Sequence, residues 1–205
     1  MLKEERIYRE ILIGVQRKKG LFYQNRVSKE CGVSIGLVNK TIKKLERQSS
    51  IQKKVKGFSV IDPSKVLLYW ATRRNIQKDV STKFCIKKDI SSIEKTLPSC
   101  VIFTGYSGWR LSTGRTPVDY REVYVYMKKK DEDKIDLWLN ENKPSKGLEN
   151  LFIMCIDDLH LINNSEKNIA PIPQIFVDLY SMGGLSSKYF LNDILDVHPE
   201  FKFEV

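Results

Sequence analysis

Acidic side chains occur at two places with a spacing that metal-dependent chemistry could use. Asp131-Glu132-Asp133 follows three lysines, and Asp157-Asp158 follows the apolar run 151–156. Paired carboxylates can hold magnesium against a triphosphate. The first group begins a helical pattern, which favours a solvated helix cap. The second favours a capped turn, because neighbouring residues on a strand point to opposite faces. Metal ligation by Asp157 and Asp158 stays open as the alternative.

Two further patterns could support acyl or phosphoryl transfer. Ser92 and Lys95 have the Ser-x-x-Lys spacing of some acyl-transfer enzymes, but Ser91 and Glu94 have the spacing of a capping box over the same residues. The segment 183–188 has the composition of a phosphate loop without its spacing, which favours a helix break. We therefore expect no enzymatic activity, no catalytic residue and no cofactor.

The cysteines and histidines do not predict a metal centre. Four cysteines are widely separated, without a Cys-x-x-Cys pair, and only two histidines accompany them: Cys31, Cys85, Cys100, Cys155, His160 and His198. Each cysteine lies in an apolar context typical of a small buried side chain, so a reducing compartment is expected. No apolar run approaches the roughly 20 residues of a membrane span, and the charged start of the chain does not resemble a signal peptide. We expect a cytoplasmic protein without membrane contact.

A different chemistry, recognition of nucleic acid, is indicated by residues 31–45. Gly32 permits the left-handed backbone that ends a helix, and Ser34 is a favourable N-cap for the next one. An apolar stripe at helical spacing follows, formed by Val38, Ile42 and Leu45. The opposite face carries small, amide and ammonium side chains, which suit the major groove of DNA. An amphipathic helix with a solvated lysine face is the alternative for this stretch alone.

A basic hairpin is predicted directly after this helix. Residues 51–61 form two β-prone halves around Lys56-Gly57, and Lys53, Lys54 and Lys56 can reach phosphates. Lysines on a hairpin can also protect a sheet edge from aggregation. The charge distribution favours DNA binding: residues 1–62 contain 15 Lys and Arg against 6 Asp and Glu, whereas the other 143 contain 20 against 19.

These observations define the predicted DNA contacts. The residues expected at the major groove are Gly36, Leu37, Asn39, Lys40 and Lys43, with Ser34 near a phosphate. The residues expected to make mainly backbone contacts are Gln24, Asn25, Arg26, Lys44, Arg47, Lys53, Lys54 and Lys56.

The elements that would position these residues can be read in chain order. The patterns predict a helix over 2–18 closed by Gly20, a short strand at 21–23, and a helix over 26–31 capped by Asn25. Asp62-Pro63 marks a boundary, since Asp suits an N-cap and Pro the first helical turn. We therefore divide the chain into a DNA-binding domain, 1–62, and a regulatory or partner-binding domain, 63–205, which begins with a connecting helix over 63–78.

The second part alternates strands and helices. Strands are predicted near 83–87, 100–103, 121–127 and 151–156, and helices near 91–97, 105–111, 131–139, 174–181 and 187–195. In the strand at 121–127, valines and tyrosines alternate between the two faces. The fold class is therefore α+β, with a mixed sheet covered by helices.

The first third resembles the winged helix-turn-helix domains of bacterial and archaeal transcription regulators. The resemblance lies in Val27–Ser34, followed by Val38, Ile42, Leu45 and Ile51.

A second resemblance covers most of residues 1–198. Its segments are Leu67–Ala71, Phe103–Gly108, Val123–Tyr126 and Ala170–Tyr180, whose order is similar to that in winged-helix proteins related to the AbiEi-type antitoxins of type IV toxin–antitoxin systems. It implies a C-terminal domain with a nucleotidyltransferase-like fold, a role as transcriptional repressor, and a protein toxin partner. The chain departs from that family at 183–188, where members often carry a Gly-Arg-Gly-rich segment.

The expected function is sequence-specific binding of double-stranded DNA by a transcriptional regulator, which could act as a homodimer on an inverted repeat. The alternative is a nucleotide-binding or nucleotidyltransferase-like enzyme with a DNA-tethering domain. Against it, the strand after Gly105-Tyr106-Ser107 contains Glu122 and tyrosines in place of paired aspartates.

Overall fold

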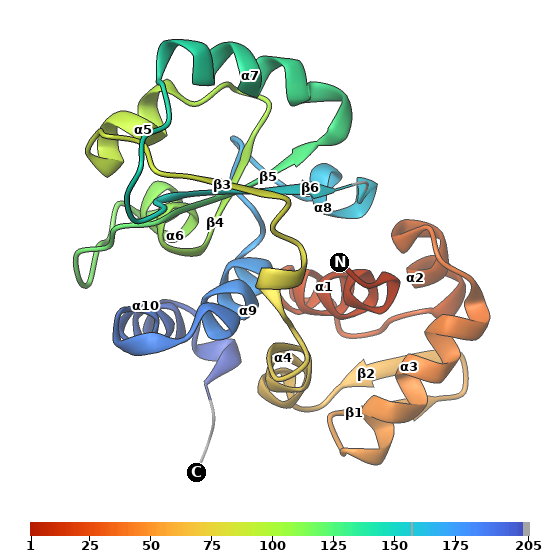
Figure 1. Cartoon of the computed structure of the whole chain (residues 1–205). Coiled ribbons are helices and arrows are strands. Elements are labelled where there is room, and N and C mark those ends of the chain that lie inside the picture. The colour runs from red at the N-terminus through yellow and green to blue at the C-terminus, as the bar shows by residue number, and fades with distance from the viewer. Residues whose placement is uncertain (157, 203–205) are drawn as a thin grey trace.

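The first 62 residues form three helices followed by a hairpin. The computed structural model describes residues 1–156 and 158–202. The helices are α1 (Lys3–Gln16), α2 (Gln24–Cys31) and α3 (Ile35–Arg47), and the hairpin strands are β1 (Ile51–Lys54) and β2 (Gly57–Val60). Figure 1 shows α2, α3 and the hairpin together at one side of the molecule, with α1 between them and the remaining elements.

The second part contains a four-stranded sheet with helices on both faces. Its strands are β3 (Thr82–Phe84), β4 (Ile102–Thr104), β5 (Val123–Lys128) and β6 (Leu151–Ile156). They lie in the order β3-β6-β5-β4, with β5 and β6 parallel and the other pairs antiparallel. The chain is therefore α+β with a mixed sheet, as predicted.

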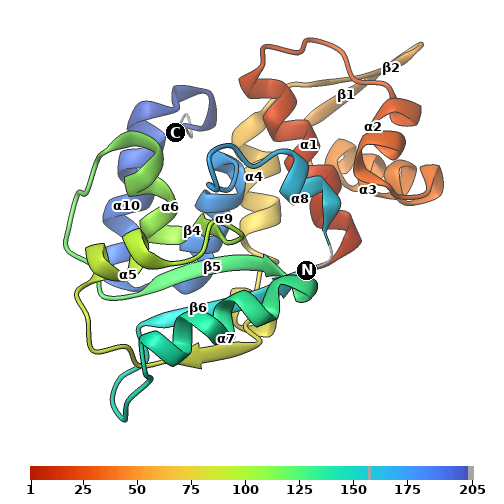
Figure 2. The ribbon, with the colours of Figure 1, turned by 90° about the horizontal axis from the view of Figure 1, so that it is seen from above.

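The helices fall into two layers around this sheet. On one face lie α5 (Ile90–Thr96) and α7 (Glu132–Glu141), and on the other lie α6 (Gly105–Thr113), α9 (Ile172–Met182) and α10 (Gly184–Val197) (Figure 1). In Figure 2, α7 lies across β5 and β6, and α8 (Leu159–Asn163) lies between the end of β6 and α1. Short 3-10 turns complete the described chain: η1 (Ile76–Lys78), η2 (Lys129–Asp131) and η3 (Pro199–Phe201).

The strand β5 shows why both layers form. Val123, Val125 and Met127 pack toward α5 and α7, whereas Tyr124 and Tyr126 belong to the core on the opposite face. All five side chains are buried. The predicted alternation is confirmed, and both faces of the strand are covered.

One hydrophobic core crosses the boundary predicted at residue 62. It includes Ile7 and Ile11 of α1, Trp70 of α4 (Pro63–Ala71), Phe176 of α9 and Phe201 near the end of the described chain. The helix α4 packs against both α1 and α9. Asp62 caps α4 as predicted, accepting a hydrogen bond from the Lys65 amide at 3.0 Å.

Several predicted helix ends are wrong. The helix α1 ends at Gln16, and Lys18, at φ 56°, makes the turn assigned to Gly20, because Phe22 must return to pair with Phe58. Asn25 does not cap α2, which begins at Gln24 directly after the extended residue Tyr23.

The capping box predicted at Ser91 is also wrong. Asp89 caps α5 by accepting from the Ser92 amide at 2.9 Å, and Glu94 is buried against Tyr120 and Arg110. Asp and Ser are caps of similar strength, but Glu94 is held by Arg110 and Tyr120 and cannot reach back to complete a capping box at Ser91.

Candidate nucleic-acid interface

The helix α3 is positioned by a tight turn that follows the predicted pattern. Gly32 takes φ 59° and ends α2, and the Ser34 hydroxyl accepts a hydrogen bond from the Leu37 amide at 3.2 Å. The Ser28 hydroxyl donates to the Val33 carbonyl at 2.6 Å and closes the turn. The three residues of the predicted stripe are fully buried: Val38, Ile42 and Leu45.

The outer face of α3 is open and cationic. Five of its residues are exposed and surround a shallow depression, which Lys44 also borders: Gly36, Asn39, Lys40, Lys43 and Arg47. Within the described part of the chain, no carboxylate oxygen lies within 4.0 Å of the cationic groups of Lys40, Lys43 or Arg47. An anionic ligand could therefore bind these groups without displacing an internal partner.

Two predicted contact residues of α3 have other roles. Leu37 is half-buried and packs against the core. The Lys44 ammonium lies 2.7 Å from Glu4, which also accepts from the Thr41 hydroxyl at 3.1 Å. Lys44 and Thr41 therefore fasten α3 to α1, and only part of the Lys44 side chain faces the depression.

The hairpin is held beside α3 by a third extended segment. Phe22 forms two backbone hydrogen bonds with Phe58, at 2.8 and 2.9 Å, and the two rings stack with centroids 5.3 Å apart. A Cβ atom on Gly57 would lie 2.2 Å from the Phe22 carbonyl oxygen, so this position requires glycine. The strand predicted at 21–23 is present as this single bridge.

The hairpin turns one residue earlier than predicted. Lys54 pairs with Gly57, so Val55 and Lys56 form the tip, and the Val55 side chain is fully exposed. Lys53, Lys54 and Lys56 are all exposed. Lys53 lies 2.5 Å from Glu46, and Lys54 donates to the Gln52 amide oxygen at 2.5 Å. Lys54 and Lys56 therefore have no acid partner among the described residues.

A second hollow joins the hairpin to the starts of α2 and α3. Its volume is about 340 Å³, and its lining consists of Tyr23, Gln24, Asn25, Ile35 and residues 53–57. The predicted contacts Gln24 and Asn25 therefore lie beside the hairpin lysines. Arg26 is exposed and lies 3.9 Å from Glu30 one turn further along α2.

Three residues at this surface were not predicted: Tyr23, Ile35 and Val55. All are exposed in spite of their apolar character. The exposure of Ile35 could have been predicted from its place in the first turn of a capped helix, and that of Val55 from its place at a hairpin tip. No pattern in the sequence separates Tyr23 from an ordinary strand residue.

Behind this surface, a buried polar network ties α1 to the second part. Arg9 is fully buried and donates to the Gln174 amide oxygen at 3.0 and 2.8 Å and to Asp158 at 3.2 Å. Because arginine has only donors, the His160 Nδ1 atom 3.2 Å away must accept, and its Nε2–H then donates to Glu10 at 3.1 Å.

A second arginine continues the network through α4. The Arg74 guanidinium lies 2.8 Å from Asp178, contacts Asp79, and lies 3.4 Å from Glu5. Asp178 also accepts from the Tyr126 hydroxyl at 2.5 Å and the Thr104 hydroxyl at 2.7 Å. The helix α1 is thus joined to β4, β5 and α9 by paired buried charges.

The carboxylates of the network have lowered pKa values. Burial alone would raise the pKa of Asp158, but the charge of Arg9 and the bond from the Leu161 amide outweigh it, so the pKa lies below the ordinary 3.8. Burial likewise opposes a lowered pKa at Glu10, where the hydrogen bond donated by His160 and the charge of Lys19 prevail. Both groups are therefore ionised near neutral pH.

The residues considered for metal or acyl chemistry lie apart from one another. Asp158 caps α8 by accepting from the Leu161 amide at 3.1 Å, as the capped-turn interpretation requires, and Asp157 lies outside the described residues. Asp131 lies 2.7 Å from Lys134 and does not cap α7. Ser92 bonds to its own cap, Asp89, and Lys95 is exposed.

The described residues contain neither a metal-binding cluster nor a membrane-spanning helix. In residues 1–156 and 158–202, no group of three or more His, Cys, Asp or Glu side chains is arranged to hold a metal ion. Over the same residues, no helix has the length and apolar character needed to cross a membrane. The helix break predicted over 183–188 is narrower: α9 ends at Met182 and α10 begins at Gly184, so only Gly183 separates them, and Gly183 and Gly184 take φ 70° and 79°.

Comparison with protein-family models, with curated proteins and with solved structures gave no match.

Proposed function

We propose that the chain binds double-stranded DNA sequence-specifically and acts as a transcriptional regulator. One observation carries the proposal: the outer face of α3 presents Asn39 together with Lys40 and Lys43, two lysines with no ion-pair partner among the described residues, beside a hairpin that carries three more lysines. A surface this rich in unpaired cations suits a polyanion, and an exposed helix of 13 residues suits a major groove.

The residues on the outer face of α3 differ in which part of the DNA they can contact. Gly36 has no side chain, so the first turn can approach the bases closely. Asn39 can form two hydrogen bonds with adenine, and Lys40 and Lys43 can reach guanine or the backbone. Ile35 adds an exposed apolar group that could contact a thymine methyl.

The hairpin and the start of α2 supply contacts to phosphate. Lys54 and Lys56 lie near the tip, and Gln24, Asn25 and Arg26 lie across the hollow from them. Contacts to phosphate fix the register of a protein on DNA and account for most of its salt dependence, whereas contacts to base edges select the sequence.

The proposed role beyond DNA binding rests on the resemblance to winged-helix regulators and to AbiEi-type antitoxins. A three-helix unit followed by a hairpin supports a winged helix-turn-helix, and the order β4-α6-β5-α7-β6 supports a nucleotidyltransferase-like arrangement in the second part. We extend the proposal to repression, to a protein toxin as partner and to a homodimer on an inverted repeat. A binding role for the second part is favoured over catalysis, because β5 carries buried tyrosines where paired acids would be needed.

The test is fluorescence anisotropy with the duplex found upstream of the gene for this chain and a scrambled duplex of equal composition, each at two salt concentrations. We expect at least tenfold tighter binding to the natural duplex. The double variant Asn39→Ala/Lys40→Ala should lose that preference, and Lys95→Ala, an exposed lysine on α5, should keep it. Equal, steeply salt-dependent binding to both duplexes would reject sequence recognition.

A further inference from the structure

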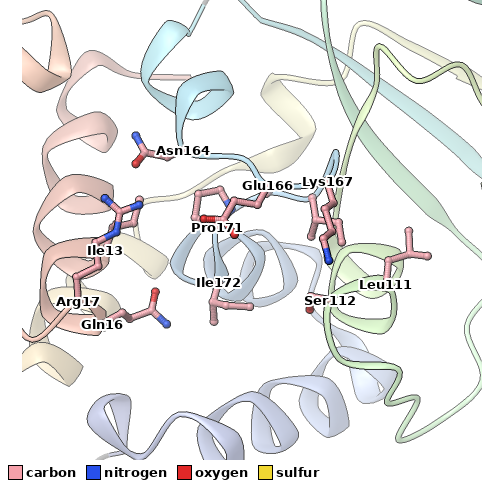
Figure 3. Close-up of a pocket in the computed structure, with 12 residues that line it drawn as sticks. Ile13, Gln16, Arg17, Leu111, Ser112, Asn164, Glu166, Lys167, Pro171 and Ile172 are labelled. Atoms are coloured by element: carbon pink, nitrogen blue, oxygen red, sulfur yellow. The ribbon is translucent and has the colours of Figure 1, made fainter.

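A cavity of about 390 Å³ opens between α1 and the second part of the chain. One wall consists of Ile13, Gln16 and Arg17 of α1, and the segment 164–172 and the end of α6 form the rest. Figure 3 shows Gln16 and Arg17 entering from α1 on one side and Lys167, Ser112 and Leu111 on the other. The volume falls within the range of small-molecule sites.

Apolar side chains form part of the cavity wall, among polar ones. Ile13 and Ala170 are buried, and Pro171 and Ile172 are half-buried, so their carbon atoms line the space without closing it. An organic group placed there would remove these atoms from water, which favours binding.

The mouth of the cavity carries two cations. Arg17 and Lys167 are both exposed, and within the described chain no carboxylate oxygen lies within 4.0 Å of either cationic group. Glu166 is the one acidic residue that the described chain contributes to the lining. The mouth therefore has a net positive charge.

Lys167 is held at the mouth by a turn with unusual backbone angles. Lys167 and Asn168 take φ 49° and 61°, a region that non-glycine residues rarely adopt. Mutual hydrogen bonds between Glu166 and Ile169, at 3.1 and 2.9 Å, close the turn, and Phe103 of β4 bonds to it on both sides. Glycine would adopt these angles more easily, but it would remove the charge.

We propose that this cavity binds a small organic anion. Its apolar body would lie against Ile13, Ala170 and Pro171, and its carboxylate or phosphate group would lie between Arg17 and Lys167. The site is separate from the DNA-binding surface, and its occupancy does not depend on the proposed function.

The test is an NMR titration of the full chain, labelled with ¹⁵N, in the absence of DNA. The probe is 2-naphthoate, and the control ligand is 2-naphthamide, which has the same shape without the charge. We expect amide shift changes to concentrate at residues 13–17 and 164–172, and at least fivefold tighter binding of the anion than of the amide.

Three variants define the electrostatic contribution. Arg17→Gln and Lys167→Asn should each weaken binding of 2-naphthoate at least threefold, with Asn chosen because it tolerates a positive φ. Glu166→Gln should strengthen it, because a like charge is removed. Lys87→Asn, an exposed lysine elsewhere, should have no effect.

The proposal is overturned by any of three results. These are shift changes away from the cavity, equal affinity for the anion and the amide, or no detectable binding at millimolar 2-naphthoate. An equal loss of affinity in Lys87→Asn would also overturn it, because the attraction would then come from the overall positive charge. Because DNA is absent from the titration, none of these results bears on DNA binding.

Discussion

At the scale of single residues, the surface proposed to bind DNA separates side chains that hold the fold from side chains that have no acid partner in the described chain. Glu4 and Glu46 neutralise Lys44 and Lys53, whereas Lys40 and Lys43 have no acid partner in the described chain. Removing a free lysine should therefore change binding and leave the free energy of unfolding almost unaltered, because exposed substitutions usually cost less than about 0.5 kcal/mol.

We predict that Lys40→Ala weakens binding to the natural duplex by about 1–3 kcal/mol and relaxes selection at one base pair. The measurement is anisotropy against a set of duplexes that each change one base pair. A uniform loss over all duplexes would instead make Lys40 a phosphate contact.

At the scale of elements, the hairpin is a phosphate-binding arm in the proposed function. It is fixed by Phe22 and Gly57 at its base, and its tip extends into solvent at Val55. An arm of this kind can follow the DNA backbone without reading base edges.

We predict that Lys54→Ala weakens binding to natural and scrambled duplexes alike and reduces the slope of log K against log salt by about one unit. The measurement is anisotropy over a salt series. A change in sequence preference as large as the change in affinity would contradict the assignment of the hairpin to the backbone.

Most elements could be predicted because their signals are local. Ser34 and Asp62 cap the helices that follow them, and the alternation over 121–127 identifies a strand. The errors at Asn25 and Ser91 come from competition. The pairing of Phe22 with Phe58 fixes where α2 starts, and Glu94, which a capping box at Ser91 needs, bonds to Arg110 and Tyr120 instead. The placement of the predicted contacts on one face also followed from helical spacing.

The buried ion pairs could not be predicted in this way. Arg9 contacts Asp158 across 149 positions, and Arg74 contacts Asp178 across 104. In the sequence alone, neither arginine can be distinguished from the exposed basic residues near it. No local rule identifies a partner that only the folded chain brings near.

At the scale of the whole molecule, the buried network should control stability. Arg74→Met would leave Asp178 and Glu5 buried beside an uncharged side chain, and breaking a buried pair in this way costs about 3–5 kcal/mol. Arg115→Met is the matched control, because its pair with Asp193 is exposed on the arginine side and should contribute about 0–1 kcal/mol.

Both free energies of unfolding can be measured by urea titration followed by circular dichroism. Similar losses in the two variants would show that the Arg74 pair is no more important than a surface contact.

The same network predicts sensitivity to acid. Asp158 and Glu10 have lower pKa values in the folded chain than their ordinary 3.8 and 4.5, so each stabilises the fold above those values and loses that contribution as pH falls below them. The free energy of unfolding should therefore be nearly constant from pH 7 to 5 and fall steeply below about pH 4.5.

The variant Asp158→Asn isolates one part of this effect. It should be less stable than the parent at pH 7 but should lose less further stability between pH 5 and pH 3, as measured by urea titrations across that range. Parallel curves for parent and variant would mean that Asp158 does not contribute to the acid transition.

The core that runs from α1 to α9 also bears on how such a chain can evolve. If only a linker joined the first 62 residues to the rest, recombination could exchange that part without disturbing its neighbour. Here a crossover near residue 62 would separate Arg9 from Gln174 and Glu5 from Trp70, whose indole donates to it at 3.1 Å. Under the proposed function, changes of DNA specificity should therefore arise by point substitution on the outer face of α3, where the exposed Asn39 and Lys40 can vary without disturbing the interior.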